Sequence, residues 1–171
     1  MIKTSIRRGT LDDLAVIAEL LAYVQRIHAD ALPHFFKQPQ AEDLSSEVVR
    51  TFVECPGNLI LLAEECDSES DNDALPVVVG YMCAVIKSAN ENPFAYANKA
   101  CHIEHVSVRP DRQGAGHGAR LMQAVRTYAQ EQGANMLTLD VWDFNTKAQL
   151  FFQGQGYTHA RHRMVIWGGG D

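Results

Sequence analysis

The sequence predicts a mixed α/β (α+β) fold, with a mostly antiparallel central sheet and helices on both faces of that sheet. Short apolar runs of strand length alternate with segments whose apolar residues recur every three or four positions, as in amphipathic helices. These segments follow the order strand, helix, helix, three strands, helix, strand, helix, strand. A length of 171 residues without an internal repeat suits a single domain over residues 1–171.

The N-terminal part is predicted as one strand followed by two helices. Ile2–Arg8 alternates as a strand does, and Thr10 then stands at a helix N-cap with Asp13 three residues later, which is the spacing of a capping box. Apolar residues at helical spacing continue this first helix to about residue 28. A shorter helix is expected over residues 41–55, where a Pro-Gly pair stops it.

Three apolar runs in the middle of the chain have the length and composition of strands. They cover residues 58–65, 77–87 and 100–108. Residues 66–75 separate the first two runs; they are small and acidic, which is typical of a mobile hairpin loop. Residues 88–98, rich in Asn, form a second loop.

The C-terminal part is predicted to alternate between helices and strands. A helix over residues 116–131 presents one apolar face and is capped by Gly133. A strand over residues 136–142 follows, and then a short helix that Asn145 caps. The last strand is expected at residues 161–167, and residues 168–171 are a frayed tail.

The composition limits the function classes. The 15 Lys+Arg and 21 Asp+Glu give a net charge of −6, which argues against nucleic acid as the main partner, because phosphate binding needs a basic surface. No apolar run reaches the roughly 18 residues of a membrane span. The N-terminus has no apolar signal core. We therefore expect a cytoplasmic protein with neither a membrane nor a nucleic acid as partner.

The cysteines indicate no disulfide framework and no metal site. They form no CxxC pair and have no metal-ligand spacing, so free thiols in a reducing cytosol are expected. The scattered histidines likewise lack the spacing of a metal site. The four cysteines are Cys55, Cys66, Cys83 and Cys101.

A glycine-rich segment between a predicted strand and a predicted helix is the strongest local motif, at residues 113–119. Glycines at a helix start let backbone N–H groups approach a phosphate, and the helix dipole favours its charge. Gly114-x-Gly116-x-x-Ala119 fits a dinucleotide fingerprint. However, Pro110 interrupts the preceding strand, and the 31 residues after Asp140 are too few to complete a doubly wound sheet.

The same segment resembles the coenzyme A loop of the GNAT superfamily of N-acetyltransferases. The superfamily signature Q/R-x-x-G-x-G/A is matched by Gln113, Gly116 and Gly118, after the hydrophobic-x-hydrophobic-x-Pro pattern that ends at Pro110. A second block of the superfamily, N-x-x-A followed by an aromatic residue and G-F/Y, is matched by residues 145–157. The resemblance covers nearly the whole chain.

This resemblance implies an enzyme that transfers an acetyl group from acetyl-CoA to a primary amine by direct attack. It implies that the strands ending near residues 108 and 142 splay apart around the pantetheine arm, and that the glycine-rich segment holds the pyrophosphate. The residues implied in coenzyme binding are Val106, Ser107, Val108, Gln113, Gly114, Ala115, Gly116, His117, Gly118, Ala119, Asn145 and Phe152.

A protonated amine cannot attack, so a general base is needed. The resemblance puts the base on the strand before the glycine loop, where Glu104 is the first candidate and His102 the second; His105 should face the other way. The general acid of many relatives is a tyrosine, but Phe152 stands at that position. Tyr157 or water could protonate the leaving thiolate, or it could leave unprotonated.

The acceptor is expected against the loop between the first two helices, near Tyr23, His34, Phe35 and Phe36. Aromatic side chains there suit an apolar or aromatic-bearing amine, on a small molecule or a peptide. A homodimer is expected by analogy with the superfamily alone. The alternative function is a non-catalytic acyl-CoA-binding regulatory module on the same fold.

Overall fold

The structure is a computed structural model that describes residues 2–40, 44, 46–67 and 75–168. Two compact units make up the chain, Met1–Asp140 and Val141–Asp171. Most of the expected acidic loop at 66–75, the first residues of the expected 41–55 helix and the end of the 168–171 tail lie outside the described residues.

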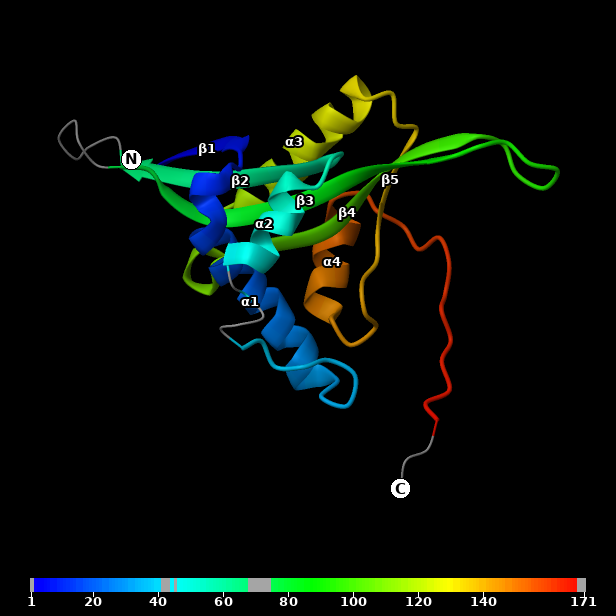
Figure 1. The fold of residues 1–171 in the computed structure, drawn as a ribbon, viewed down its shortest axis with the longest axis horizontal. Helices are drawn as coiled ribbons and strands as arrows, with labels where there is room; N and C mark the ends of the chain where they lie inside the picture. The colour runs from blue at the N-terminus through cyan, green and yellow to red at the C-terminus, as the bar shows by residue number, and fades with distance from the viewer. Residues whose placement is uncertain (1, 41–43, 45, 68–74, 169–171) are drawn as a thin grey trace. The chain divides into compact units, whose positions relative to one another are not determined.

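A five-stranded sheet in the order β1-β2-β3-β4-β5 forms the centre of the first unit (Figure 1). β1 to β4 pair as successive antiparallel neighbours, and β5 pairs with β4 in parallel. The prediction of a mixed, mostly antiparallel sheet is therefore confirmed. The strands are β1 (Ile2–Arg8), β2 (Asn58–Asp67), β3 (Val77–Ala89), β4 (Asn98–Val108) and β5 (Met136–Leu139).

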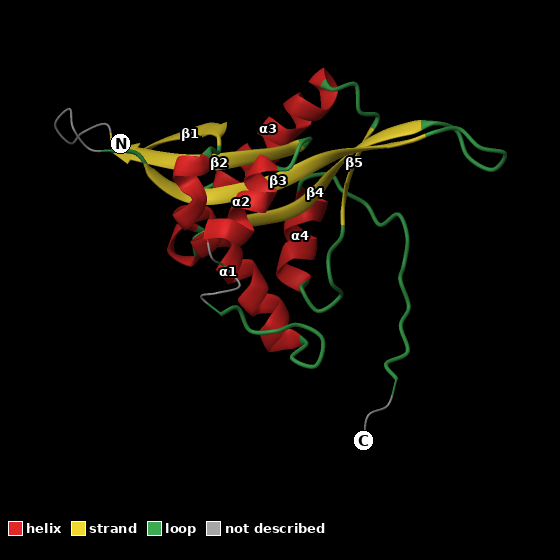
Figure 2. Cartoon of the chain, viewed as in Figure 1, coloured by secondary structure: helices red, strands yellow, loops and turns green. Residues whose placement is uncertain are grey.

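Helices cover both faces of this sheet (Figure 2). α1 (Leu14–Ala31) and α2 (Ser46–Glu54) lie on one face, and α3 (His117–Glu131) lies on the other. None of the helices in the described residues is long and apolar enough to span a membrane. The core between α1, α2 and the sheet consists of Leu14, Ile17, Leu20, Leu21, Val49, Ile60, Leu62, Val78, Tyr81 and Cys83.

The alternation along β3 separates the two halves of the core. Tyr81 and Cys83 belong to the cluster under α1, so their neighbour Gly80 faces α3. A Cβ atom at Gly80 would lie 3.1 Å from the carbonyl oxygen of Ser107 and 3.4 Å from the side chain of Leu121. The glycine thus allows α3 to pack closely on the sheet.

The predicted capping box is present on the 3-10 helix Leu11–Asp13, which leads directly into α1, and it is part of an ion-pair cluster. The Asp13 side chain accepts a hydrogen bond from the backbone N–H of Thr10. It also accepts two from the Arg7 guanidinium, each 2.8 Å long, while Arg7 donates a third to Glu64 at 2.6 Å. The hydrogen bonds from Arg7 outweigh the opposing effect of burial and lower the pKa of Asp13 to about 2.

A β-bulge interrupts the pairing of β3 with β4. Cys83 pairs with His105, but the next residue, Ala84, pairs with Ile103. Glu104 is therefore an extra residue on β4, opposite no residue of its own on β3. Because Glu104 is an extra residue, the side chains before it and after it on β4 alternate out of phase with each other. The bulge therefore changes which side chains of β4 share a face of the sheet.

The second unit contains one helix in its described residues, α4 (Thr146–Gly154), and here the prediction of a last strand is wrong. No strand of the described residues pairs with residues 161–167. An apolar, β-branched segment has the composition of a strand, but a strand also needs a partner for its backbone N–H and C=O groups. The preceding strand is also shorter than predicted, because β5 ends at Leu139.

Candidate active site

The chain leaves β4 and enters the glycine-rich loop through one short helical turn. The backbone N–H of Arg109 donates to the carbonyl oxygen of Val79 at 2.8 Å, which holds the end of β4 against β3. A 3-10 helix at Pro110–Arg112 follows. The side-chain amide of Gln113 then donates to the carbonyl oxygen of Val108 at 3.1 Å. The loop is thereby attached to the last residue of the strand.

Two glycines of the loop need a conformation that other residues avoid. Gly114 and Gly116 both have φ of +87°, in the left-handed region. Gly116 is the N-cap of α3 and supplies no side-chain cap, so no side chain covers the first N–H groups of the helix from that position. No heavy atom lies within 4 Å of a Cβ atom placed on either glycine. The loop therefore presents exposed backbone donors, which is the arrangement that binds a phosphate group.

His117 differs from the other residues of the loop because its side chain is buried. The imidazole is 1% exposed, and its Nε2 atom lies 2.7 Å from Oε1 of Glu65 on β2. The angles at this contact are not those of a hydrogen bond, so it is a close electrostatic contact. The other Glu65 oxygen lies 3.4 Å from Nε of Arg112. The burial of this side chain leaves only the backbone of His117 as a candidate for coenzyme binding, and the sequence offered no signal for Glu65 as its partner.

The edge of β4 nearest the loop has no neighbouring strand. β5 pairs with β4 only from Ala100 to Ile103, and β4 continues to Val108. No other strand of the described residues lies along this part of β4 on that side. The backbone of Val106 and Val108 is accordingly available on that edge, while the Ser107 side chain is buried.

The two candidate bases lie together on β4. Nε2 of His102 is 3.9 Å from Oε2 of Glu104, and Nδ1 of His102 is 2.9 Å from Oγ1 of Thr138 on β5. The other Glu104 oxygen accepts a hydrogen bond from Lys87 at 2.7 Å. Partial burial acts to raise the pKa of Glu104, but the hydrogen bond and the charge of Lys87 outweigh it, so this pKa lies below its ordinary value. Glu104 is therefore a carboxylate at neutral pH.

The expectation that His105 faces away from the candidate bases is wrong. His102 pairs with Val85 and His105 pairs with Cys83, and these two β3 residues are two positions apart on one face. The extra residue Glu104 causes this change of phase. The His105 ring contacts Phe52 of α2 edge-on, with centroids 5.9 Å apart. Sequence reasoning missed His105 because no residue pattern announces a bulge.

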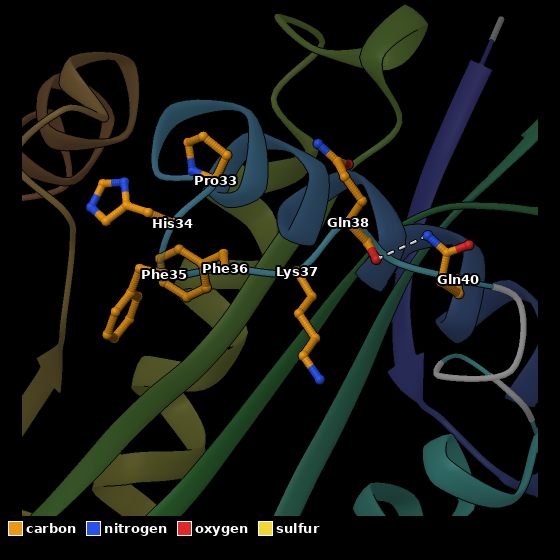
Figure 3. Close-up of a pocket in the computed structure, with 7 residues that line it drawn as sticks. All are labelled: Pro33, His34, Phe35, Phe36, Lys37, Gln38 and Gln40. Carbon is orange, nitrogen blue, oxygen red and sulfur yellow. Dashed lines mark hydrogen bonds between the residues drawn. The ribbon is translucent and has the colours of Figure 1, made fainter. Parts of the chain in front are cut away.

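An aromatic cavity lies on this face of the sheet, under the loop between α1 and α2. Its volume is about 460 Å³, and it opens beside a second hollow of about 510 Å³ in the same loop. Three of the four predicted acceptor residues meet here: His34 lines the hollow, and Phe35 and Phe36 line both (Figure 3). The cavity is completed by Leu21, Gln25, Lys37, Gln38, Pro39, Leu44, Val48, Phe52 and His105.

The fourth predicted acceptor residue, Tyr23, lies elsewhere on α1. Its ring packs against the core cluster, and its hydroxyl donates to Glu19 at 3.3 Å. Glu19 also pairs with Arg109 at 3.0 Å, next to the end of β4. Tyr23 thus lies near a charged contact between α1 and β4, and it does not line the aromatic cavity.

The two predicted coenzyme residues of the second unit lie at the two ends of α4. Asn145 caps the helix, because its side-chain oxygen accepts the N–H of Ala148 at 3.1 Å. Phe152 is buried, with ring centroids 5.3 Å from Phe151 and 6.0 Å from Tyr157. The aromatic ring at position 152 is therefore part of the packing of this unit.

The buried thiols do not have the character of nucleophiles. Burial, followed by the negative charge of Glu104, raises the pKa of Cys83 to about 12, and burial also raises the pKa of Cys101. A nucleophilic cysteine needs a lowered pKa instead. Within the residues that the structure describes, no three His, Cys, Asp or Glu side chains gather as metal ligands.

A mostly antiparallel sheet, with a free edge on β4 and a glycine loop at the start of α3, defines an acyl-CoA N-acyltransferase fold and excludes the doubly wound sheet of dinucleotide-binding proteins. The model of the acetyltransferase (GNAT) family matches residues 23–157. The chain belongs to this family and is an acetyl-CoA-dependent N-acetyltransferase.

The chain is also similar to individual proteins. Thialysine N-epsilon-acetyltransferase of Bos taurus is 25% identical over 127 residues, which cover 73% of this chain and 71% of that protein. The solved structure of a tetramutant of the BH1408 protein from Bacillus halodurans has a TM-score of 0.83 at 21% identity, covering 95% and 98% of the two chains. Aminoglycoside N-acetyltransferase AAC(6')-Iy in complex with CoA has a TM-score of 0.69 at 17% identity, covering 99% and 96%.

Proposed function

We propose that this protein moves the acetyl group of acetyl-CoA to a primary amine, on a small molecule or a peptide, by direct attack assisted by a general base on β4. The observation that carries the proposal is that the edge of β4 and one face of β4 offer two different kinds of groups. Its free edge leads into the glycine loop at residues 113–119, and one of its faces carries Glu104, His102 and His105 beside an aromatic cavity. One strand can thus serve the coenzyme and the acceptor together.

On the coenzyme side, the backbone is expected to do most of the binding. The N–H groups of residues 114–119 would hold the pyrophosphate, since Gly114 and Gly116 turn the chain so that these donors are exposed. Backbone groups of Val106 and Val108 would bind the pantetheine arm and polarise the acetyl carbonyl. When bound, acetyl-CoA supplies the activated thioester. Asn145 and Phe152 are proposed as further coenzyme contacts on the resemblance to the family.

On the acceptor side, β4 would remove a proton. An alkylamine has a pKa near ~10.4 and is protonated at neutral pH, so its lone pair is not free to attack. The Glu104 carboxylate attracts the ammonium group and is our first candidate for the base, acting through water. His102 is the second candidate, although its hydrogen bond with Thr138 and its contact with Glu104 equally suit a residue that orients the carboxylate.

The acceptor itself would occupy the aromatic cavity. Phe35, Phe36 and Phe52 give it apolar walls, Lys37 lines it as well, and His34 lines the neighbouring hollow. A cavity of about 460 Å³ suits a small molecule or the end of a peptide. Two relatives are named for small amines, thialysine and aminoglycosides, which favours a small amine here as well. Tyr23 is proposed as a contact on the α1 side of the acceptor.

The leaving group needs no assigned acid. Phe152 carries no hydroxyl, so it cannot protonate the thiolate of CoA. A thiol has a pKa of about 8.5, which means that the thiolate is a fair leaving group near neutral pH even without a proton. Tyr157, whose ring centroid lies 6.0 Å from that of Phe152, carries a hydroxyl and is the residue of this unit to test as an acid.

Two measurements test the proposed function. Isothermal titration should show that acetyl-CoA binds, and a panel of thialysine, lysine, spermidine, neamine and a short peptide should give at least one acetylated product by mass spectrometry, with equal release of free CoA. Absence of binding at millimolar acetyl-CoA would contradict the proposal. Binding without turnover of any amine would favour the alternative, a non-catalytic acyl-CoA-binding module.

A further inference from the structure

We propose that His105 is the group that accepts the proton of the amine bound in the aromatic cavity, with Glu104 behind it as the charge that stabilises the protonated imidazole. This inference rests on the proposed function and deepens it: His105 takes the proton directly, and Glu104, the first candidate base above, acts through His105. It concerns a residue that a regular strand would turn away from the acceptor, and that the bulge at Glu104 brings to the acceptor side.

The position of His105 carries the argument. It is a lining residue of the aromatic cavity, whereas neither Glu104 nor His102 lines it. Its ring is 5.9 Å from that of Phe52 and 6.4 Å from that of Tyr81, both measured between centroids, so packing on two sides fixes its orientation. An amine held between Phe36 and Phe52 would therefore meet the imidazole before it met the carboxylate.

The charge around His105 suits a proton acceptor. Burial lowers the pKa of His105, the negative charge of Glu104 acts to raise it, and His28 acts to lower it further. The imidazole is consequently neutral at pH 7 and has a free lone pair. The neutral imidazole is the form of histidine that can accept a proton as a general base.

The charges that other titratable groups place around His105 follow from the elements packed against it. Burial lowers the pKa of His28 on α1, so it adds little positive charge at pH 7. Burial also keeps the hydroxyl of Tyr81 and the thiol of Cys83 on β3 protonated. Lys87 is engaged by Glu104, and His102 stands beyond Glu104. Lys37 is the remaining cation among the lining residues of the cavity.

The step balances without a further reactant. A ring nitrogen of His105 takes one proton from the ammonium group, which frees the nitrogen lone pair. That lone pair forms the N–C bond to the acetyl carbon, and the C–S bond of the thioester breaks, so the electron pair leaves on sulfur. The imidazolium lies beside the Glu104 carboxylate until its proton returns to solvent.

The test compares two acceptors that differ in their need for a base. 2-Phenylethylamine is an ammonium ion at pH 7, whereas benzohydrazide is already neutral and has a similar shape. Turnover of both acceptors should be measured with the wild type and with the His105→Gln and His105→Phe variants. The His105→Phe variant keeps an aromatic ring against Phe52. The exposed His162→Gln is the control variant.

We expect kcat for 2-phenylethylamine to fall by about a hundredfold or more in both variants, and kcat for benzohydrazide to change by less than about threefold. In the wild type, the kcat/KM profile for 2-phenylethylamine should show an ionisation below about pH 6.5 that is absent for benzohydrazide. This second measurement needs no variant, so it holds if a variant fails to fold.

Four outcomes would overturn the role of His105. Equal losses with both acceptors would mean that the residue only supports the cavity. Unchanged turnover of 2-phenylethylamine would mean that it takes no proton, and identical pH profiles for the two acceptors would mean the same. A wild-type enzyme that acetylates other amines of the panel but neither probe would overturn this inference and leave the proposed function intact. No turnover of any amine would contradict the proposed catalysis itself.

Discussion

The buried imidazole of His117 and the carboxylate of Glu65 lie 2.7 Å apart, and they join the first turn of α3 to the end of β2. Glu65 also reaches Arg112, on the other side of the glycine loop. One carboxylate thus contacts the chain immediately before and immediately after Gly114 and Gly116. The conformation of the loop depends on this anchor as well as on its glycines.

Glu65→Ala should therefore loosen the loop. Removing the carboxylate leaves a buried imidazole without its partner, and the free energy of unfolding should fall by about 1–3 kcal/mol. Acetyl-CoA affinity should fall by about tenfold, or ~1.4 kcal/mol, because the backbone donors lose their fixed positions. Urea denaturation and isothermal titration measure the two effects. Asp111→Asn is the control, since that side chain is 70% exposed beside the same Arg112; equal losses in both variants would contradict the anchor.

Gly116→Ala should weaken coenzyme binding through the backbone. The φ of +87° disfavours any residue with a Cβ atom by about 1–2 kcal/mol, although the space beside it is open. The loop should relax to a negative φ and turn its N–H groups away, so the dissociation constant for acetyl-CoA should rise at least tenfold. Gly154→Ala, at the last residue of α4 without a positive φ, is the matched control. Unchanged affinity in Gly116→Ala would argue against phosphate binding by this loop.

Glu104→Gln should slow catalysis without impairing coenzyme binding. Loss of the carboxylate removes the negative charge that attracts the ammonium group and stabilises the transferred proton, so kcat should fall by about a hundredfold or more. His102→Gln should have a smaller effect, because His102 does not line the cavity and lies 3.9 Å from the Glu104 carboxylate. Steady-state release of CoA measures both variants, with the exposed Glu91→Gln as control. A larger loss in His102→Gln than in Glu104→Gln would contradict the role given to the Glu104 carboxylate.

The Asp13–Arg7 pair should make stability depend on pH in the acid range. The folded state holds the pKa of Asp13 at about 2, below its unfolded value, so the folded state binds this proton less readily. The stabilisation is complete above about pH 4 and is lost as the pH falls through about 2. It amounts to about 1–2 kcal/mol, because Arg7 is 38% exposed and solvent screens the pair.

Chemical denaturation between pH 6 and pH 2.5 measures this contribution. Asp13→Asn should lose it and show a flatter pH dependence of stability than the wild type. The matched control is Asp12→Asn, in the same turn: Asp12 is exposed, and only its backbone N–H joins the cap. A wild type and an Asp13→Asn variant with parallel pH profiles would contradict the assignment.

The sequence was sufficient for the order of elements from the first strand to α4 and for the position of the glycine loop, because both depend on local patterns. Helical periodicity defined α1 and α3, and the three glycines marked the start of α3. It was insufficient for Glu65, which lies about 50 residues from His117 along the chain and meets it only through the packing of α3 on β2. It also failed at residues 161–167, where strand composition is present but a pairing partner among the described residues is not.

The face of the sheet on which His105 lies shows a second limit of prediction from the sequence. Alternation along a strand assumes one residue per position, and a single extra residue inverts every assignment beyond it. No residue type at 103–105 announces the bulge. The sequence thus identified the strand that carries the candidate bases, but only the register with β3 reveals which side chains share its acceptor face.

At the bulge, substitution and deletion of residues would have different effects on this enzyme. Substitutions at positions 104 and 105 alter the groups offered to the acceptor while Ile103, on the opposite face, stays in the core, so these two positions are suited to stepwise change of substrate preference. Deleting Glu104 is a different event. The strand would regain a regular register in which His105 still pairs with Cys83 and Ile103 still pairs with Ala84, so both side chains would keep their faces. Deletion at this one position would therefore remove the carboxylate beside His105 while leaving the imidazole on the acceptor face.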